Sequence, residues 1–269
     1  MNTYGTDRSV PTAQQIKQLG IFLGFILEVV TRIVTRFFFG LSSAEAKALM
    51  QNKGVLSKKL KEALAPVFVM DADPYAEQRT YWETFYQKYL GLTADFDLVP
   101  IPERPALGEW RLVFIMKGLS MNWVAGSFRK LLIAYDPEWT LWQYVDDLDA
   151  AITRNIRTSA ESYAIWVRDE QESDEEFRGR PTSQVDPDQL IGVTVLERLV
   201  HGMVHFAETK QHLDLNGITL CSGSRGTDGG VPRVLCYPDD HQVRVHWYYL
   251  DLSNQSGGVR RAVSLPKAS

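Results

Sequence analysis

The sequence is poor in the residues that mark several common classes of protein. Its 269 residues include only two cysteines, Cys221 and Cys236. Two are too few for a disulfide framework, so we expect two reduced, partly buried thiols. Basic residues are not in excess, since the net charge is −4 at pH 7. A general nucleic-acid binder needs a basic face that displaces counterions, so nucleic acid is not an expected partner.

Signals for export and for membrane insertion are also missing. Residues 1–10 lack the basic segment, short apolar run and cleavage site of a signal peptide, so a cytoplasmic location is expected. The stretch Gly20–Gly40 is long and apolar, but Glu28, Arg32 and Arg36 form a charged stripe along it. Each charge at the centre of a bilayer costs about 2.5–3.5 kcal/mol. The sequence therefore predicts no transmembrane segment.

The fingerprints of the large enzyme classes do not occur. The chain has no G-x-S-x-G elbow, phosphate-binding loop or dinucleotide-binding motif, and no cofactor is expected. Its composition, 45% apolar and 23% charged residues, is typical of a globular chain with enough apolar material for a sizeable core.

Helical patterns dominate the first third of the chain. The apolar pattern from Pro11 to Phe39 predicts a long helix, and the capping box Ser42–Glu45 begins a short one. A third helix begins at Asp73-Pro74, carries an aromatic stripe expected in the core, and stops at Gly91. We expect the first of these helices to pack in the core with one face exposed to solvent. Alternatively, the helix contacts a partner chain, a second copy of this chain included, or a membrane surface.

Prolines between Thr93 and Gly108 indicate an extended linker. They divide the chain into a helical region, residues 1–92, for scaffolding or oligomerisation, and a mixed domain, residues 93–269. The predicted fold class is α+β. The elements expected early in the mixed domain are strands at 111–116, 131–135 and 163–167 and a helix at 119–130. The acidic run Asp169–Glu176 is expected to be a solvated helix face.

A second capping box, Thr194–Glu197, predicts another amphipathic helix. Glu197, His201 and His205 follow at four-residue intervals and share one face, which is the spacing of a helical zinc site. No glutamate follows His201, however, and no further ligand is marked. A metal-dependent enzyme built on this face is therefore an alternative hypothesis.

The last third of the mixed domain predicts short strands between polar loops. In Gln242–Tyr248 apolar and polar residues alternate, which places them on opposite faces of a strand. The expected inward framework is Leu220, Val231, Val234, Val243, Val245, Trp247, Val259 and Val263. The residues expected to be displayed, and so to bind a ligand, are Arg233, Tyr237, His241, Gln242, Arg244, His246, Tyr248, Tyr249, Asp251, Ser253 and Asn254. Tyrosine, arginine, serine and asparagine are favoured on recognition surfaces.

Two short segments carry a resemblance to a known family. Leu220–Arg225 and the closing Gly258-Val259-Arg260 resemble elements of C-type-lectin-like folds of the formylglycine-generating-enzyme type, most closely the variable proteins of diversity-generating retroelements. The resemblance implies a C-terminal antiparallel sheet with an invariant framework and diversified exposed positions. Copper-dependent oxidases of that fold use a closely spaced cysteine pair, which Cys221 and Cys236 do not reproduce. The chain also resembles a group of uncharacterised bacterial proteins that share YAIWVRDEQ and TLCSGSR.

These patterns favour a non-catalytic recognition protein over an enzyme. The displayed C-terminal residues would bind a protein or a glycan, while the N-terminal helices scaffold or form a homo-oligomer. Two alternatives stay open: the metal-dependent enzyme at Glu197, His201 and His205, and a helical interaction protein that acts through residues 11–39.

Overall fold

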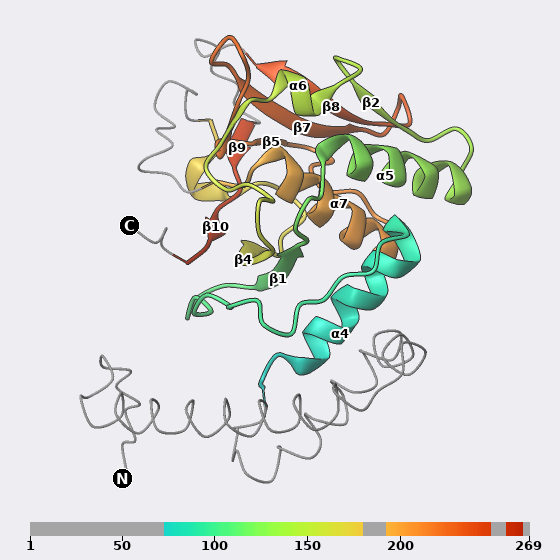
Figure 1. Cartoon of the computed structure of the whole chain (residues 1–269). Coiled ribbons are helices and arrows are strands. Elements are labelled where there is room, and N and C mark those ends of the chain that lie inside the picture. The colour runs from blue at the N-terminus through green and yellow to red at the C-terminus, as the bar shows by residue number, and fades with distance from the viewer. Residues whose placement is uncertain (1–72, 180–191, 249–256, 266–269) are drawn as a thin grey trace, which may run out of the picture. The chain divides into compact units, whose positions relative to one another are not determined.

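The computed structural model describes residues 73–179, 192–248 and 257–265, which contain both helices and sheets (Figure 1). The predicted α+β class is therefore confirmed for this part of the chain. These residues belong to one compact unit, which spans Asp73–Ser269. The helix predicted at residues 11–39 and the capping box at residues 42–45 lie outside the described residues.

The third predicted helix is confirmed, and of its aromatic stripe Trp82, Phe85 and Tyr86 lie in the core while Tyr81 is exposed. Helix α4 (Ala76–Phe85) continues into a π-helical turn, η1 (Tyr86–Leu90), and ends at Gly91, whose φ of 67° is left-handed. Trp82 Nε1 and Tyr86 Oη donate hydrogen bonds of 2.9 Å to carbonyl oxygens of the neighbouring strand. The buried aromatic rings thus satisfy their polar atoms on the backbone against which they pack.

The proline-rich segment at residues 93–108 is not a free linker. Arg79 donates hydrogen bonds to the carbonyl oxygens of Phe96 and Val99. The Phe96 ring is buried, with its centroid 4.9 Å from that of Phe114. Residues 73–92, which the sequence assigns to the helical region, therefore lie in the same unit as the sheets. The scaffolding role of residues 1–72 stays a prediction.

A three-stranded antiparallel sheet has the order β1-β4-β10. Its strands are β1 (Trp110–Ile115), β4 (Tyr163–Arg168) and β10 (Ala262–Val263). β1 and β4 confirm two predicted strands. Between them in sequence lie helix α5 (Met121–Tyr135) and the single turn α6 (Leu148–Ala151).

The strand predicted at residues 131–135 is wrong, because α5 continues to Tyr135. The predicted helix ends at Lys130, but neither Lys130 nor Leu131 is a helix breaker such as glycine or proline. Leucine and alanine are strong helix formers, and the buried Leu132 continues the apolar face of the helix. A short apolar run is ambiguous between a strand and a helix when it is considered alone.

A five-stranded sheet has the order β2-β8-β7-β5-β9. Its strands are β2 (Thr140–Gln143), β8 (Gln242–Tyr248), β7 (Val231–Tyr237), β5 (Ile218–Leu220) and β9 (Gly257–Val259). β2 pairs with β8 in parallel, as β5 does with β9, while the other pairs are antiparallel. The C-terminal sheet is therefore mixed, whereas the sequence predicted an antiparallel one. β3 (Arg154–Asn155) and β6 (Ser224–Arg225) form a separate pair.

Helix α7 (Val195–Thr209) lies between the two larger sheets and alongside α5 (Figure 1). Its predicted capping box is present: the Thr194 hydroxyl accepts from Glu197 N, and the Glu197 carboxylate accepts from Thr194 N. The predicted core positions Leu196, Leu199 and Met203 are buried.

The acidic run Asp169–Glu176 is not a solvated helix face. It forms bends and a short 3-10 helix, η2 (Glu175–Phe177), and its side chain Asp174 is buried. Asp174 Oδ2 accepts a hydrogen bond of 3.0 Å from Arg261 N, and burial raises the pKa of this carboxyl to about 6. Partners from distant segments hold the run in place, and its local sequence does not show them.

A fully buried carboxylate, Asp214, joins α7 to the C-terminal strands. Asp214 Oδ2 accepts from Arg198 Nη2 at 2.7 Å and from the Thr219 hydroxyl at 2.6 Å, and Oδ1 accepts from Arg260 Nη2 at 3.1 Å. Burial alone would raise the pKa of Asp214, but the two guanidinium groups hold it below its ordinary value. The carboxylate is therefore ionised although it is fully buried.

We predict that Asp214→Asn lowers the free energy of unfolding by about 3–5 kcal/mol, because it leaves two buried cations with too little opposite charge. Urea denaturation at pH 7 measures the loss. Asp240→Asn is the matched control, since the pair that Asp240 forms with Arg244 is partly exposed and should contribute below about 1 kcal/mol. Equal losses in the two variants would contradict the prediction.

Candidate functional site

Strand β8 presents two different faces, as the sequence predicts. Val243 and Val245 are buried in the main core, while Gln242, Arg244 and His246 lie on the opposite face and are half-buried. Trp247 follows the valines in the alternation but is only half-buried. Its indole lies so close to Gly226 and Gly230 that a Cβ on either glycine would overlap the ring. Glycine at these two positions therefore makes room for Trp247.

The rest of the predicted framework does not share one face. Val234 lies in the main core with Val243 and Val245. Leu220, Val231 and Val259 belong instead to a second apolar cluster with Phe177, Ile218 and Leu235. The register explains the split, because Val231 lies opposite Tyr248 and Leu235 opposite Arg244, and residues directly opposite each other share a face. Strand β7 is buried on both faces, so simple alternation misassigns its residues.

An aromatic and cationic surface forms where β2, β8 and β7 lie side by side. We call it the β8 face and define it by five residues: Trp142, Tyr237, Gln242, Arg244 and His246. Trp142 pairs in register with Arg244, and Tyr237 with Gln242. The rings of Trp142 and His246 stack with centroids 5.5 Å apart and planes 27° apart. The exposed fractions of Trp142 and Tyr237 are 39% and 37%.

Arg244 is the centre of the β8 face. Its Cζ lies 4.3 Å from the ring centroid of Tyr237 and 5.9 Å from that of Trp142. Arg244 Nη2 donates to Asp240 Oδ2 at 2.6 Å, and Nε donates to Gln242 Oε1 at 2.7 Å. The guanidinium is therefore fixed by two hydrogen bonds beside two aromatic rings.

The other predicted display residues have varied positions. Arg233 lies opposite His246 on the same side of the sheet and is half-buried, and Tyr248 lies opposite Val231. His241 lies in the β7–β8 turn with a φ of 52°. The remaining predicted residues, Tyr249, Asp251, Ser253 and Asn254, lie outside the described residues. Sequence reasoning missed Trp142, although it alternates with Leu141 along β2, because β2 meets β8 only through a distant pairing.

The helix face Glu197, His201 and His205 is not arranged as a metal centre. Burial alone would raise the pKa of Glu197, but Arg157 holds it below its ordinary value, with N–O distances of 2.6 and 2.8 Å. His201 is buried, 3.7 Å from Asp169, and desolvation lowers its pKa to about 3. Within the described ranges, the only three metal-ligating side chains whose ligand atoms lie within 4.8 Å of one another are Glu83, Asp95 and Asp97, of which the two aspartates are exposed.

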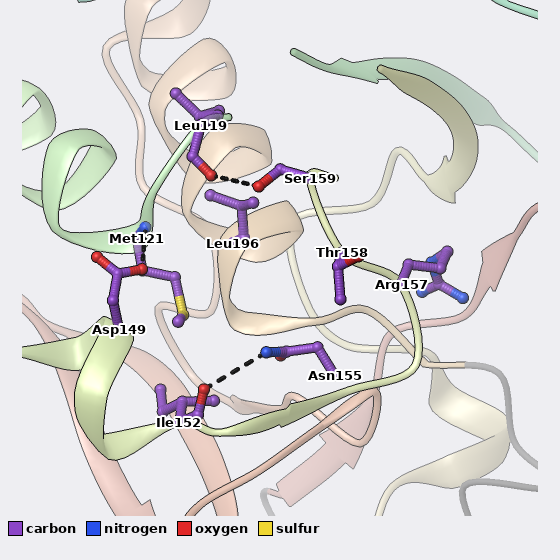
Figure 2. A pocket seen from close by; sticks show the side chains of 9 residues that line it. All are labelled: Leu119, Met121, Asp149, Ile152, Asn155, Arg157, Thr158, Ser159 and Leu196. Atoms are coloured by element: carbon purple, nitrogen blue, oxygen red, sulfur yellow. Dashed lines mark hydrogen bonds between the residues drawn. The ribbon is translucent and has the colours of Figure 1, made fainter. Parts of the chain in front are cut away.

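Two cavities adjoin the loop that connects β3 to β4. Figure 2 shows the smaller, of about 160 Å³, which lies between the N-terminus of α5, helix α6 and this loop. The larger, of about 800 Å³, lies along residues 155–164 and is also lined by Pro100, Ser264 and Leu265. Asn155, Arg157 and Thr158 line both cavities. No residue of the β8 face lines either one.

Comparisons with models of protein families, with curated proteins and with solved structures found nothing that matches this chain. The resemblance to C-type-lectin-like variable proteins therefore stays a prediction. Within the residues that the structure describes, none of the helices has both the length and the apolar character needed to cross a bilayer.

Buried histidines make stability depend on pH. His212 lies between Trp139 and Phe206, with ring centroids at 4.0 and 4.7 Å, and desolvation lowers its pKa to about 4. The unfolded chain has a histidine pKa near 6.5, so folding favours the neutral ring. Its contribution to stability is complete above that value and is lost as the pH falls toward 4.

We predict that His212→Phe flattens the pH dependence of the free energy of unfolding between pH 7 and pH 4. The phenyl ring keeps the stacking between Trp139 and Phe206 but cannot take up a proton. The loss of unfolding free energy attributable to His212 should amount to roughly 1–3 kcal/mol between pH 7 and pH 4. Urea denaturation at several pH values measures it. Parallel curves for the two proteins would show that His212 does not titrate as argued.

Proposed function

We propose that this protein is a non-catalytic recognition protein that binds a partner protein through the β8 face. The observation that carries the proposal is the fixed guanidinium of Arg244, held by Asp240 and Gln242 beside the half-exposed rings of Tyr237 and Trp142. Arginine, tyrosine and tryptophan are the side chains that contribute most to binding energy at protein interfaces.

Preorganisation supports the proposal. Arg244 is ordered before a partner arrives, so less side-chain entropy is lost on binding. Val243 and Val245, on the other side of the same strand, are buried in the main core and fix the backbone that carries the display. A rigid sheet with outward aromatic groups suits an extended macromolecular surface, whereas small molecules favour concave sites. The two cavities lie elsewhere in the chain.

A protein partner fits the β8 face better than a glycan. Sugars bind to aromatic rings by stacking on an open ring face, but the Arg244 guanidinium lies 4.3 Å from the Tyr237 centroid and covers one face of that ring. The fixed guanidinium instead offers its remaining N–H donors to carboxylate or carbonyl groups of a polypeptide.

The metal-enzyme alternative gains no support from the arrangement of its residues. The Glu197 carboxylate accepts hydrogen bonds from Arg157, Tyr163 and the Thr194 backbone, so its lone pairs are already used. His201 is buried and does not form a ligand cluster with Glu197 and His205.

A double substitution, Trp142→Ser with Arg244→Ala, tests the proposal. We expect it to leave the fold intact, because both side chains are partly exposed, and to weaken the partner complex by about tenfold or more, as loss of central interface residues does. The wild-type chain and the variant are each used to recover proteins from a lysate of the source cell. Proteins that the wild-type chain recovers and the variant does not are purified. Their dissociation constants are then measured by calorimetry.

The matched control removes exposed apolar surface from another face. Ile133→Ser with Tyr135→Ser truncates two exposed residues of α5 and should leave the dissociation constant unchanged. Equal weakening by both double variants, or unfolding of the β8-face variant, would contradict the proposal. A glycan that binds the wild-type chain and not the β8-face variant would replace the protein partner with a carbohydrate.

We also propose, from the sequence resemblance, that the positions of the β8 face on β7 and β8, namely Tyr237, Gln242, Arg244 and His246, are diversified. A reverse-transcriptase gene beside an imperfect repeat of the segment that encodes Arg225–Arg260 is the expected genomic arrangement. A gene neighbourhood without both elements would contradict the diversification, while the recognition proposal would still stand on the geometry of Arg244.

A further inference from the structure

The larger cavity has the size of a small-molecule site. Its volume of about 800 Å³ lies within the range of roughly 300–1,000 Å³ that such sites occupy. One wall is the loop that leads from β3 into β4, and Pro100 and Leu265 also line the cavity. The β8 face does not use this cavity.

Arg157 is the only cationic side chain among the described residues that line the cavity. Its Nε donates to Glu197 Oε1, and its Nη2 donates to Glu197 Oε2 and the Gly192 carbonyl. The third nitrogen, Nη1, makes no hydrogen bond to any described residue. Nη1 is also not one of the buried polar atoms without a hydrogen-bond partner, so it is not sealed inside the protein. The exposed fraction of the Arg157 side chain is 11%, and both cavities adjoin it.

The Glu197 carboxylate fixes the position of Arg157. Glu197, which holds it, is buried and also accepts hydrogen bonds from the Tyr163 hydroxyl at 2.8 Å and from Thr194 N at 2.7 Å. These two donors fix the Glu197 carboxylate. The guanidinium is therefore held in one orientation, and its Nη1 donors remain for a second acceptor. Figure 2 shows the Arg157 side chain extending from the loop away from Met121 and Ile152.

The remaining lining combines apolar surface with a few hydroxyl groups. Pro100, Ile156 and Leu265 provide apolar surface, and Thr158 and Ser264 provide hydroxyls. Glu161, the only acidic residue in the part of the lining that the structure describes, is 78% exposed and pairs with Lys117 at 2.8 Å. Its charge is therefore balanced outside the cavity and does not oppose an anion beside Arg157.

We propose that this cavity binds a small carboxylate that carries an apolar body. The carboxylate accepts hydrogen bonds from Arg157 Nη1, and the apolar body packs against Pro100, Ile156 and Leu265. A carboxylate matches the planar guanidinium, and charge assistance makes such hydrogen bonds about twice as strong as neutral ones. The inference is independent of the β8 face, since the two sites share no residue.

Three probe carboxylates, namely phenylacetate, benzoate and 3-methylbutanoate, test the proposal with the full chain. We expect at least one of them to raise the melting temperature and to shift backbone NMR signals at residues 155–164 and 264–265. Phenylacetamide, which has the shape of phenylacetate without its charge, should bind about tenfold more weakly or not at all. If none of the three carboxylates shifts these signals, the proposal is wrong.

Two variants separate binding in the cavity from a general effect on the fold. Ala160→Trp places a large ring at an exposed position that lines the cavity and leaves the Arg157–Glu197 pair in place, so it should abolish binding without unfolding the chain. The double variant Arg157→Gln with Glu197→Gln removes both charges of the pair at once and should also abolish binding. Carboxylate binding that persists in Ala160→Trp would overturn the proposal, even if the double variant failed to fold.

Discussion

The described part of the chain depends on the buried carboxylate of Asp214. Its two oxygens bind guanidinium groups from α7 and from the connection between β9 and β10, and Thr219 of β5 donates to it as well. Arg260 also donates to the backbone carbonyls of Arg168 and Glu170. Separating any of these groups would leave a charge in a medium that solvates it poorly, so arrangements that keep helix, sheet and acidic turn together around Asp214 are favoured.

The same constraint explains why the polar residues of α7 are structural. A helix between two sheets has little wet surface, and each charged group on it requires a partner. Glu197 is paired with Arg157, and Arg198 with Asp214. His201 stays neutral because burial disfavours its charged form. The four-residue spacing of Glu197, His201 and His205, which suggested a zinc site, is the spacing of a helix face that lies against the charged centre of the fold.

Local patterns predicted what depends on neighbours in sequence: the capping box at Thr194, the stop at Gly91 and the alternation along β8. They failed where the cause is distant. Asp214 is 46 residues from Arg260, and no short motif records such a pair. Trp142 joins Arg244 only because β2 lies parallel to β8. Strand β7 has buried apolar residues on both faces, since each face meets a different cluster, and alternation alone cannot show that.

The division of the sheet determines where a recognition surface can lie. On the side of the sheet that carries Arg244, the half nearer β5 and β9 is covered by the apolar cluster around Leu220, Val231 and Leu235. The half at β2 and β8 carries Trp142, Arg244 and His246, whose backbone is fixed from the inner side by Val243 and Val245. Side chains on this half can change without opening the main core, because a strand separates its two faces completely. Variation and binding are therefore compatible with stability at the β8 face, including Tyr237 at the end of β7. They are not compatible with stability at Val231 and Leu235 of β7, which are buried in the second apolar cluster.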